Sequence, residues 1–176
     1  MQRRLPILIG LMGAGKTHIG RLLARRLQAP FIDLDEWIVR QEGMSIPEIF
    51  ERFGERGFRE RETTALRELV AKPVVLATGG GVVMREENRH LLRRHPPVVW
   101  LRAEPEVLAK RIDGDANRPL IASGGTLARL EELSAVRTPL YQSCADFIVD
   151  TDMLTPEQAC QSILDFLSSF EAAPGE

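Results

Sequence analysis

The chain has little of several features, and each shortage excludes a class of protein. Its two cysteines, Cys144 and Cys160, are too few and too far apart for a disulfide framework or a cysteine metal site. No apolar run approaches the roughly 18 residues that a membrane-spanning helix needs. Basic residues do not outnumber acidic ones, because 23 Lys and Arg stand against 25 Asp and Glu, for a net charge of −2. We therefore expect neither a nucleic acid nor a membrane as a partner.

What remains is the composition of an ordinary globular protein. With 176 residues, 44% of them hydrophobic, the chain can form one domain with a real core. Met1–Leu5 lead straight into the first predicted strand and leave no room for a signal peptide, and the two thiols suit a reducing compartment. We therefore expect a cytoplasmic protein. Only three of the basic residues are lysines, which makes Lys16 a rare residue.

Short apolar runs alternate with longer stretches of helical periodicity. The apolar runs predict five buried strands, at Leu5–Ile9, Phe31–Leu34, Val74–Ala77, Val98–Leu101 and Phe147–Val149. Helices are predicted at Thr17–Leu27, from Ser45 with Glu48 completing a capping box, and at Arg56–Val70, Glu86–Arg94, Pro105–Ile112, Leu127–Thr138 and Pro156–Phe170. This alternation predicts an α/β fold, with a mostly parallel sheet between two layers of helices. Asp113–Gly125 is polar and rich in Gly, which predicts a mobile surface loop, and residues 171–176 are expected to be a flexible tail.

The segment Gly10–Thr17, GLMGAGKT, fits the phosphate-binding pattern G-x-x-x-x-G-K-[ST] between a predicted strand and a predicted helix. Glycines allow backbone N–H groups to curl around phosphates, and the helix N-terminus adds positive dipole. Lys16 can reach the β- and γ-phosphates, and the Thr17 hydroxyl can bind Mg²⁺. The segment predicts a nucleotide site.

Acidic residues end the second predicted strand, in Asp33-Leu34-Asp35. Alternating strand side chains would point both carboxylates over the ligand crevice at the carboxyl edge of the sheet. One could then hold the water shell of the metal and the other could accept a proton from an attacking hydroxyl. A pair of acids at a helix start is the alternative.

Other segments are ambiguous when each is taken alone. Arg59 and Glu62 share a helix face, so Glu62 could orient Arg59, or the two could form a surface ion pair. Thr78-Gly79-Gly80-Gly81 could present open N–H groups to a ligand or form a tight turn. Arg118 could swing over the phosphates or be solvated, and Arg137 could end its helix merely to favour the dipole.

Taken in order, these segments resemble shikimate kinase. The resemblance runs from about Leu5 to Phe170 and rests on GLMGAGKT, FIDLD, the helix that begins Ser-Ile-Pro-Glu-Ile-Phe, FRERE, TGGG, NRPL and R-x-P-L-Y at Arg137–Tyr141. It implies a nucleoside monophosphate kinase-like fold with a five-stranded parallel sheet. It also implies a single kinase domain over residues 1–170, with a helical substrate-binding region at about 35–70 and a mobile lid at about 113–125.

The resemblance also implies roles on the nucleotide side. Lys16 would contact the β- and γ-phosphates, Thr17 would bind Mg²⁺ and Asp33 would hold the metal through water. Arg111 would stack on adenine, and Arg118 would be the lid arginine. The nucleotide-binding set would be Gly13, Ala14, Gly15, Lys16, Thr17, His18, Arg111 and Arg118. His18 departs from the small hydroxyl residue usual at this place, although its imidazole could donate the same contact to the α-phosphate.

On the acceptor side the resemblance implies shikimate. Arg59 and Arg137 would hold its carboxylate, since guanidinium forks suit carboxylates. Asp35 would bind its hydroxyls and could act as the base, and Gly80 and Gly81 would offer backbone contacts. The catalytic set would be Lys16, Asp35 and Arg118. Ser143 replaces an acid that is frequent in the family, and we expect only a local effect.

We therefore expect a monomeric shikimate kinase that transfers the γ-phosphate of ATP to the 3-hydroxyl of shikimate, with Mg²⁺, in aromatic amino acid biosynthesis. The alternatives are a kinase of the same fold for another small hydroxy acid, such as gluconate, and a non-catalytic nucleotide-binding module. A nucleoside monophosphate kinase fits less well, because no site for an acceptor phosphate is evident in the sequence.

Overall fold

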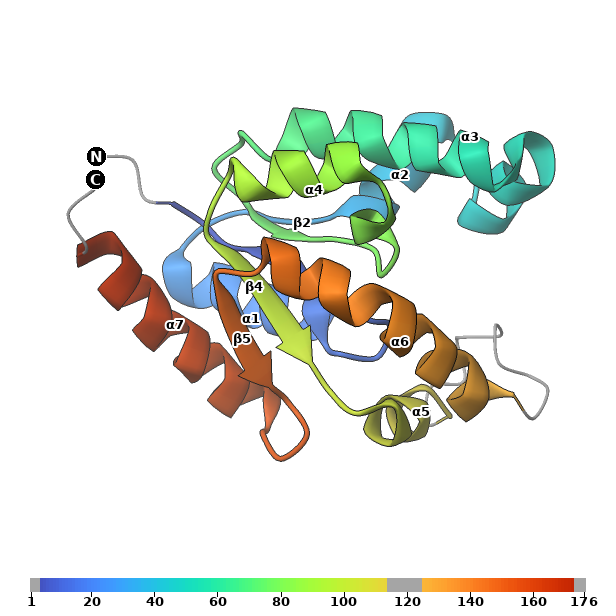
Figure 1. The fold of residues 1–176 in the computed structure, drawn as a ribbon. Coiled ribbons are helices and arrows are strands. Elements are labelled where there is room, and N and C mark those ends of the chain that lie inside the picture. Colours follow the sequence, from blue (N-terminus) through green and yellow to red (C-terminus); the bar gives the residue numbers. More distant parts are fainter. Residues whose placement is uncertain (1–3, 114–124, 173–176) are drawn as a thin grey trace.

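A computed structural model describes residues 4–113 and 125–172 of the chain. Its sheet has five parallel strands in the order β2-β3-β1-β4-β5 (Figure 1). The strands are β1 (Ile7–Ile9), β2 (Phe31–Asp33), β3 (Val75–Ala77), β4 (Val98–Arg102) and β5 (Phe147–Asp150). The helices are α1 (Lys16–Leu27), α2 (Leu34–Glu42), α3 (Ile46–Leu69), the short 3₁₀ helix η1 (Val82–Met84), α4 (Glu86–Arg93), α5 (Pro105–Asp113), α6 (Thr126–Cys144) and α7 (Pro156–Ala172).

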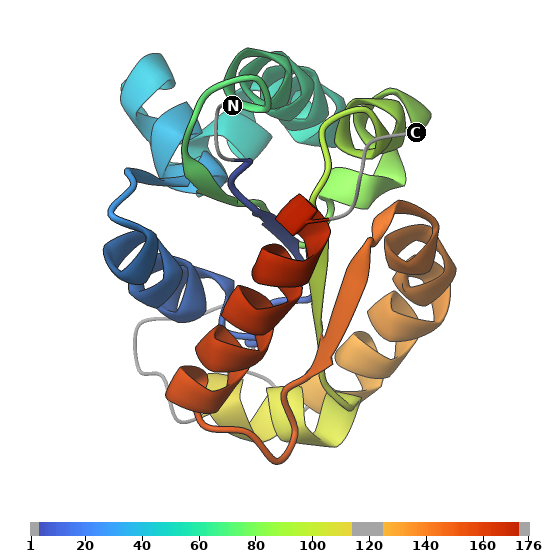
Figure 2. The same cartoon turned by 90° about the vertical axis from the view of Figure 1, so that its left-hand side faces the viewer.

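Helices cover the sheet on both sides. Helices α1 and α7 pack together on one face, and α4 and α6 pack together on the other (Figure 2). Strands β1 and β3 are buried along their whole length, as strands covered on both faces must be. The predicted three-layer α/β fold with a five-stranded parallel sheet is confirmed. No helix within the described ranges combines the length and the apolar character that spanning a membrane requires.

Strand β1 lies in the middle of the sheet, and this arrangement places the site. Leu8 pairs with Ala77 of β3, and Asp33 of β2 pairs with the same Ala77. The carboxyl ends of β1, β2 and β3 therefore meet at one edge. The loop from Gly10, the acids from Asp33 and the glycines from Gly79 leave the sheet side by side there.

The prediction for Asp35 was wrong in its geometry. Strand β2 ends at Asp33, and Asp35 lies in the first turn of α2, a helix whose start the sequence analysis did not predict. The Asp33 side chain accepts a hydrogen bond from the Glu36 N–H (3.1 Å) and so caps this helix. The alternative, acids at a helix start, describes the backbone correctly.

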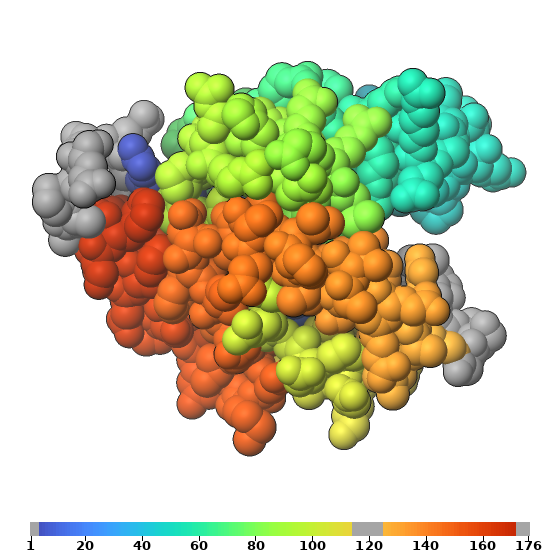
Figure 3. Space-filling view, in the orientation of Figure 1, coloured from blue at the N-terminus to red at the C-terminus, as the bar shows by residue number. Residues whose placement is uncertain are grey.

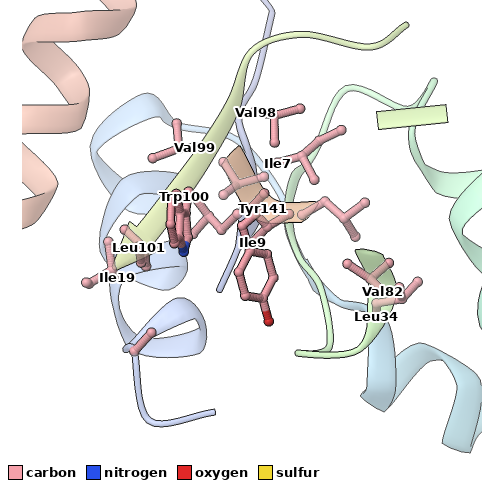
Figure 4. Close-up of a cluster of buried hydrophobic side chains, with 14 of the residues drawn as sticks. Ile7, Ile9, Ile19, Leu34, Val82, Val98, Val99, Trp100, Leu101 and Tyr141 are labelled. Carbon is pink, nitrogen blue, oxygen red and sulfur yellow. The ribbon is translucent and has the colours of Figure 1, made fainter. Parts of the chain in front are cut away.

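The prediction that Arg137 ends a helix was also wrong. Helix α6 continues through Pro139 to Cys144, so Arg137 lies inside it. Proline lacks one N–H donor, but continuing the helix buries Tyr141 and Cys144 against the sheet, and that burial outweighs the lost hydrogen bond. Figure 4 shows the Tyr141 ring among side chains of β1 and β4, beside Trp100 and Ile9.

Helix α3 has two segments, as the sequence predicts. Ser45 accepts a hydrogen bond from the Glu48 N–H (3.3 Å) and caps the first segment. Gly54 then adopts φ 69° and ψ −179°, which breaks the helical path before the second segment begins. The second segment carries Arg59 and Glu62 toward the sheet edge.

Candidate active site

The loop from Gly10 to Thr17 forms a compact turn over the end of β1. Gly15 takes a left-handed conformation (φ 95°) at the cap of α1, and a side chain at Gly10 would collide with the Leu101 carbonyl oxygen, 2.4 Å from where its Cβ would lie. Lys16 folds back over the loop, and its Nζ donates to the carbonyl oxygens of Gly10 and Leu11, the latter at 3.0 Å. The ammonium group is therefore held over the cradle in which phosphates would bind.

Thr17 and Asp33 meet beside this loop. The Thr17 Oγ1 hydroxyl donates to Asp33 Oδ2 at 2.9 Å, while the other carboxylate oxygen of Asp33 caps α2. A hydroxyl and a carboxylate are the hard oxygen ligands that Mg²⁺ prefers. Within residues 4–113 and 125–172, no group of three or more His, Cys, Asp or Glu side chains could hold a metal alone.

Two carboxylates, of the half-buried Asp35 and the fully buried Glu62, face Gly79. A Cβ at Gly79 would lie 3.0 Å from Asp35 Oδ1 and 3.4 Å from Glu62 Oε2, and neither oxygen accepts a hydrogen bond from a described residue. Burial raises the pKa of the Asp35 carboxyl above its usual value, and the charge of Asp33 adds to the rise, while Lys16 and Arg59 oppose it. A hydroxyl group that enters the site could therefore donate a hydrogen bond to Asp35 Oδ1 or to Glu62 Oε2.

Glu62 and Arg59 form a buried pair, so the surface-pair alternative was wrong. Arg59 Nη1 donates to Glu62 Oε1 at 2.8 Å, and Glu62 is fully buried. Burial raises the pKa of the Glu62 carboxyl, although the contact with Arg59 lowers it. On its other side Arg59 approaches Glu55, at 3.7 Å. These contacts hold the guanidinium in one orientation.

The second arginine lies against the same turn. A Cβ at Gly80 would lie 3.2 Å from Arg137 Nη1, and a Cβ at Gly81 would lie 2.3 Å from Arg59 Nη2. The two guanidinium groups therefore occupy the space where consecutive residues would carry side chains. The glycines of TGGG make room for these arginines, in addition to leaving the backbone bare.

Arg59 and Arg137 line one cavity of about 510 Å³ between α3 and α6. Figure 3 shows a notch in the surface between α3 and the N-terminal part of α6, where these elements face each other. Apolar side chains of Met12, Phe50, Leu130 and Leu133 complete the wall, and Arg129 adds a third guanidinium. The cavity is large enough for a small organic acid and carries an excess of positive charge. Arg129 was missed, although it precedes Arg137 by eight residues on the same helix and therefore shares its face.

A second cavity, of about 660 Å³, lies under α6 near the ends of β4 and β5. Its wall carries three carboxylates, Glu104, Asp150 and Asp152, of which Asp150 pairs with Arg102. An acidic wall suits neither a triphosphate nor an organic acid.

Arg111 joins the phosphate-binding loop to the segment that follows β5. Its guanidinium donates to the Thr151 carbonyl oxygen (2.7 Å), to Thr151 Oγ1 (3.1 Å) and to the Gly13 carbonyl oxygen (3.3 Å). The planar group is thereby fixed between the phosphate-binding loop and the end of β5. His18 is exposed beside the same loop, and Arg118 lies outside the described residues.

Comparisons with known proteins agree with this geometry. The family model "Shikimate kinase" matches residues 12–168. A shikimate kinase of Ralstonia nicotianae is 50% identical over 157 residues, which cover 89% of this chain and 83% of that protein. One of Neisseria meningitidis is 52% identical over 146 residues, covering 82% and 86%. A solved shikimate kinase of Acinetobacter baumannii in complex with shikimate superimposes with a TM-score of 0.90 at 39% identity, and the match covers 98% of this chain and 97% of that one.

Proposed function

The chain belongs to the shikimate kinase family and is an ATP-dependent kinase of that family, and from this premise we propose where ATP and shikimate bind and how the γ-phosphoryl group passes from one to the other. The proposal places the acceptor in the cavity between α3 and α6 and the nucleotide on the loop from Gly10 to Thr17. One observation carries the proposal. The guanidinium groups of Arg59 and Arg137 lie against consecutive glycines, at the edge of the sheet from which the phosphate-binding loop begins.

The acceptor binds through its carboxylate to Arg59 and Arg137, which together form the carboxylate clamp. Guanidinium groups bind carboxylates with short, charge-assisted hydrogen bonds. Glu62 keeps Arg59 in place, and the close approach of Arg137 to Gly80 keeps the second guanidinium near the first. Held at this end, a small ring acid reaches with its hydroxyls toward Asp35, whose Oδ1 accepts from no described donor. Gly80 and Gly81 supply further backbone contacts.

The nucleotide side uses the phosphate-binding loop. Backbone N–H groups of Gly13, Ala14 and Gly15, with the N-terminus of α1 and His18, surround the phosphates. Arg111 presents its planar face to adenine. Thr17 and Asp33 would hold Mg²⁺, Thr17 directly and Asp33 through water. The bound ion would supply positive charge to the phosphates.

The reaction is an in-line transfer of the γ-phosphoryl group from ATP to the 3-hydroxyl of shikimate. The O–P bond to ADP breaks, a new O–P bond forms, and the hydroxyl proton passes to Asp35. Lys16, already turned over the loop, neutralises charge on the β- and γ-phosphates, and Arg118 adds positive charge in the transition state. Positioning by the clamp and the loop supplies most of the acceleration, because such a transfer needs little covalent help.

We further propose that residues 35–70 form the acceptor-binding region and 113–125 the lid of one domain over residues 1–170. The proposed cytoplasmic location is supported by two buried free cysteines, Cys144 and Cys160. The proposed monomer is supported by the clamp, since both arginines and both glycines come from one chain.

A coupled assay of ADP release over a panel of hydroxy acids, with Mg²⁺ and ATP, tests the function. We expect turnover with shikimate and little with gluconate or with a shikimate analogue that lacks the carboxylate. Turnover with gluconate alone would support a different acceptor. Bound ATP without turnover on any acid would support a non-catalytic module.

A further inference from the structure

Tyr141 is the only tyrosine in the chain, and it joins the core to the active site. Its ring is buried and packs against Trp100, with ring centroids 5.5 Å apart. In Figure 4 its oxygen atom points out of the labelled apolar cluster. The hydroxyl donates to the Gly80 carbonyl oxygen at 2.5 Å. Burial raises the pKa of the Tyr141 phenol, and the nearby positive charge of Arg137 opposes the rise.

The geometry of the peptide group gives this contact a consequence. The Gly80 carbonyl and the Gly81 N–H belong to one planar unit, and in a trans peptide they point in opposite directions. Whatever fixes the carbonyl therefore also fixes the direction of the N–H. Neither Gly80 nor Gly81 uses its N–H in a hydrogen bond with another residue in the described ranges.

Glycine makes this restraint necessary. Three consecutive glycines follow Thr78, and without side chains the peptide units between them can rotate at low cost. The neighbouring segment is held, because the Val82 N–H donates to the Gly79 carbonyl oxygen (3.2 Å) and the Met84 N–H donates to the Gly81 carbonyl oxygen (3.1 Å). The Gly80 carbonyl is the remaining one of the three, and its partner is a side chain from α6.

We propose that Tyr141 is a positioning residue for acceptor binding. Its hydroxyl holds the Gly80–Gly81 peptide with the Gly81 N–H turned away from α6 and available to the acceptor. One phenol thus orients a backbone donor beside the guanidinium of Arg137, which lies against Gly80, before the acceptor arrives. The inference rests on the proposed function, because it places the acceptor at this turn.

The variant Tyr141→Phe tests this role, since it removes the hydroxyl and keeps the ring. We expect the KM for shikimate to rise about 3- to 10-fold, as the loss of one hydrogen bond allows, with the KM for ATP unchanged. Ser143→Ala is the matched control, because it removes another hydroxyl of α6, one whose described contacts, with the Leu140 carbonyl oxygen (2.7 Å) and the Cys144 sulfur (3.7 Å), both lie within its own helix. Equal rises in both KM values, or no rise, would overturn the proposal.

A second measurement does not depend on turnover. In an amide NMR spectrum, Tyr141→Phe should shift the resonances of Gly80 and Gly81 and leave those of Gly43 and Gly54, which lie in other segments, in place. Unchanged resonances of Gly80 and Gly81 would overturn the positioning role. If the unaltered protein did not phosphorylate shikimate, the proposed function would fail, and the spectrum would still decide whether the hydroxyl orients this peptide.

Discussion

Replacing Gly81 by alanine should disable one arm of the carboxylate clamp without touching the arginine itself. The new Cβ would lie 2.3 Å from Nη2, 2.5 Å from Nη1 and 2.6 Å from Cζ of Arg59. Gly81 has φ −89° and ψ 5°, a conformation that residues other than glycine adopt in turns, so the collision of the methyl group is the main effect of the substitution. Arg59 must move, although its hydrogen bond to the buried Glu62 opposes the movement.

The magnitude follows from what Arg59 is proposed to do. A hydrogen bond to a charged group contributes about 1.5–3 kcal/mol, so its loss should raise the KM for shikimate by about 10- to 150-fold. The KM for ATP should stay the same, because Arg59 is proposed to bind the acceptor and not the nucleotide. Moving Arg59 away from Glu62 leaves a buried carboxylate with a weaker partner, so we also expect a stability loss of about 1–3 kcal/mol.

Steady-state kinetics with both substrates varied, together with thermal melting, would measure these effects. Gly80→Ala is the graded comparison, since its Cβ would lie 3.2 Å from Arg137 Nη1 and a small shift would relieve the contact. In an Arg59→Ala background, the alanine at position 81 should cost nothing more. If Gly81→Ala changed the KM for shikimate by less than about twofold, or cost as much without Arg59 as with it, the clamp would not work as described.

Four further variants or measurements test the remaining parts of the site. Asp33→Asn should weaken Mg²⁺ activation while keeping α2 capped, whereas Asp33→Ala should also lower stability by about 0.5–2 kcal/mol; equal melting of the two variants would contradict the capping role. Arg111→Met should raise the KM for ATP far more than that for shikimate, in the same kinetic assay. Arg118→Ala should lower kcat much more than it weakens shikimate binding, and equal losses would argue against a role in the transition state. Burial raises the pKa of the Tyr141 phenol above its ordinary value of about 10, so its ultraviolet titration should begin at higher pH in the folded protein than in urea. The folded state keeps the proton that the unfolded state loses, so this contribution to stability is present below about pH 10 and disappears as the pH rises further.

Local patterns predicted the fold with few errors. The five strands and most helices came from apolar periodicity, and the capping role of Ser45 came from one short motif. One error lies where tertiary contacts overrule a local rule, and the other lies where a local helix start was overlooked. Helix α6 runs through Pro139 because Tyr141 and Cys144 are buried beyond it, and nothing within that segment indicates the burial. Asp35 was assigned to a strand because apolar residues precede it, while the cap formed by Asp33 begins a helix.

The site residues were named from the sequence, but several of their physical roles were not evident there. Arg59 and Glu62 share a helix face in any α-helix, and only the packing of α3 decides that the pair is buried and not solvated. The Tyr141 hydroxyl belongs to a noted motif, yet its partner, the Gly80 carbonyl oxygen, is 61 residues away.

By itself, the sequence determined the order of strands and helices, the phosphate-binding loop and the identity of the charged residues, because each depends on neighbours within a few positions. The tertiary structure decided which of those charges are buried and which meet. Asp33 and Gly80 come from distant segments and share one edge because parallel strands bring their carboxyl ends together, and Arg137 reaches the same edge from helix α6. Burial then changes the chemistry of the charged residues, because removing a charge from water costs free energy and the charge then requires a partner.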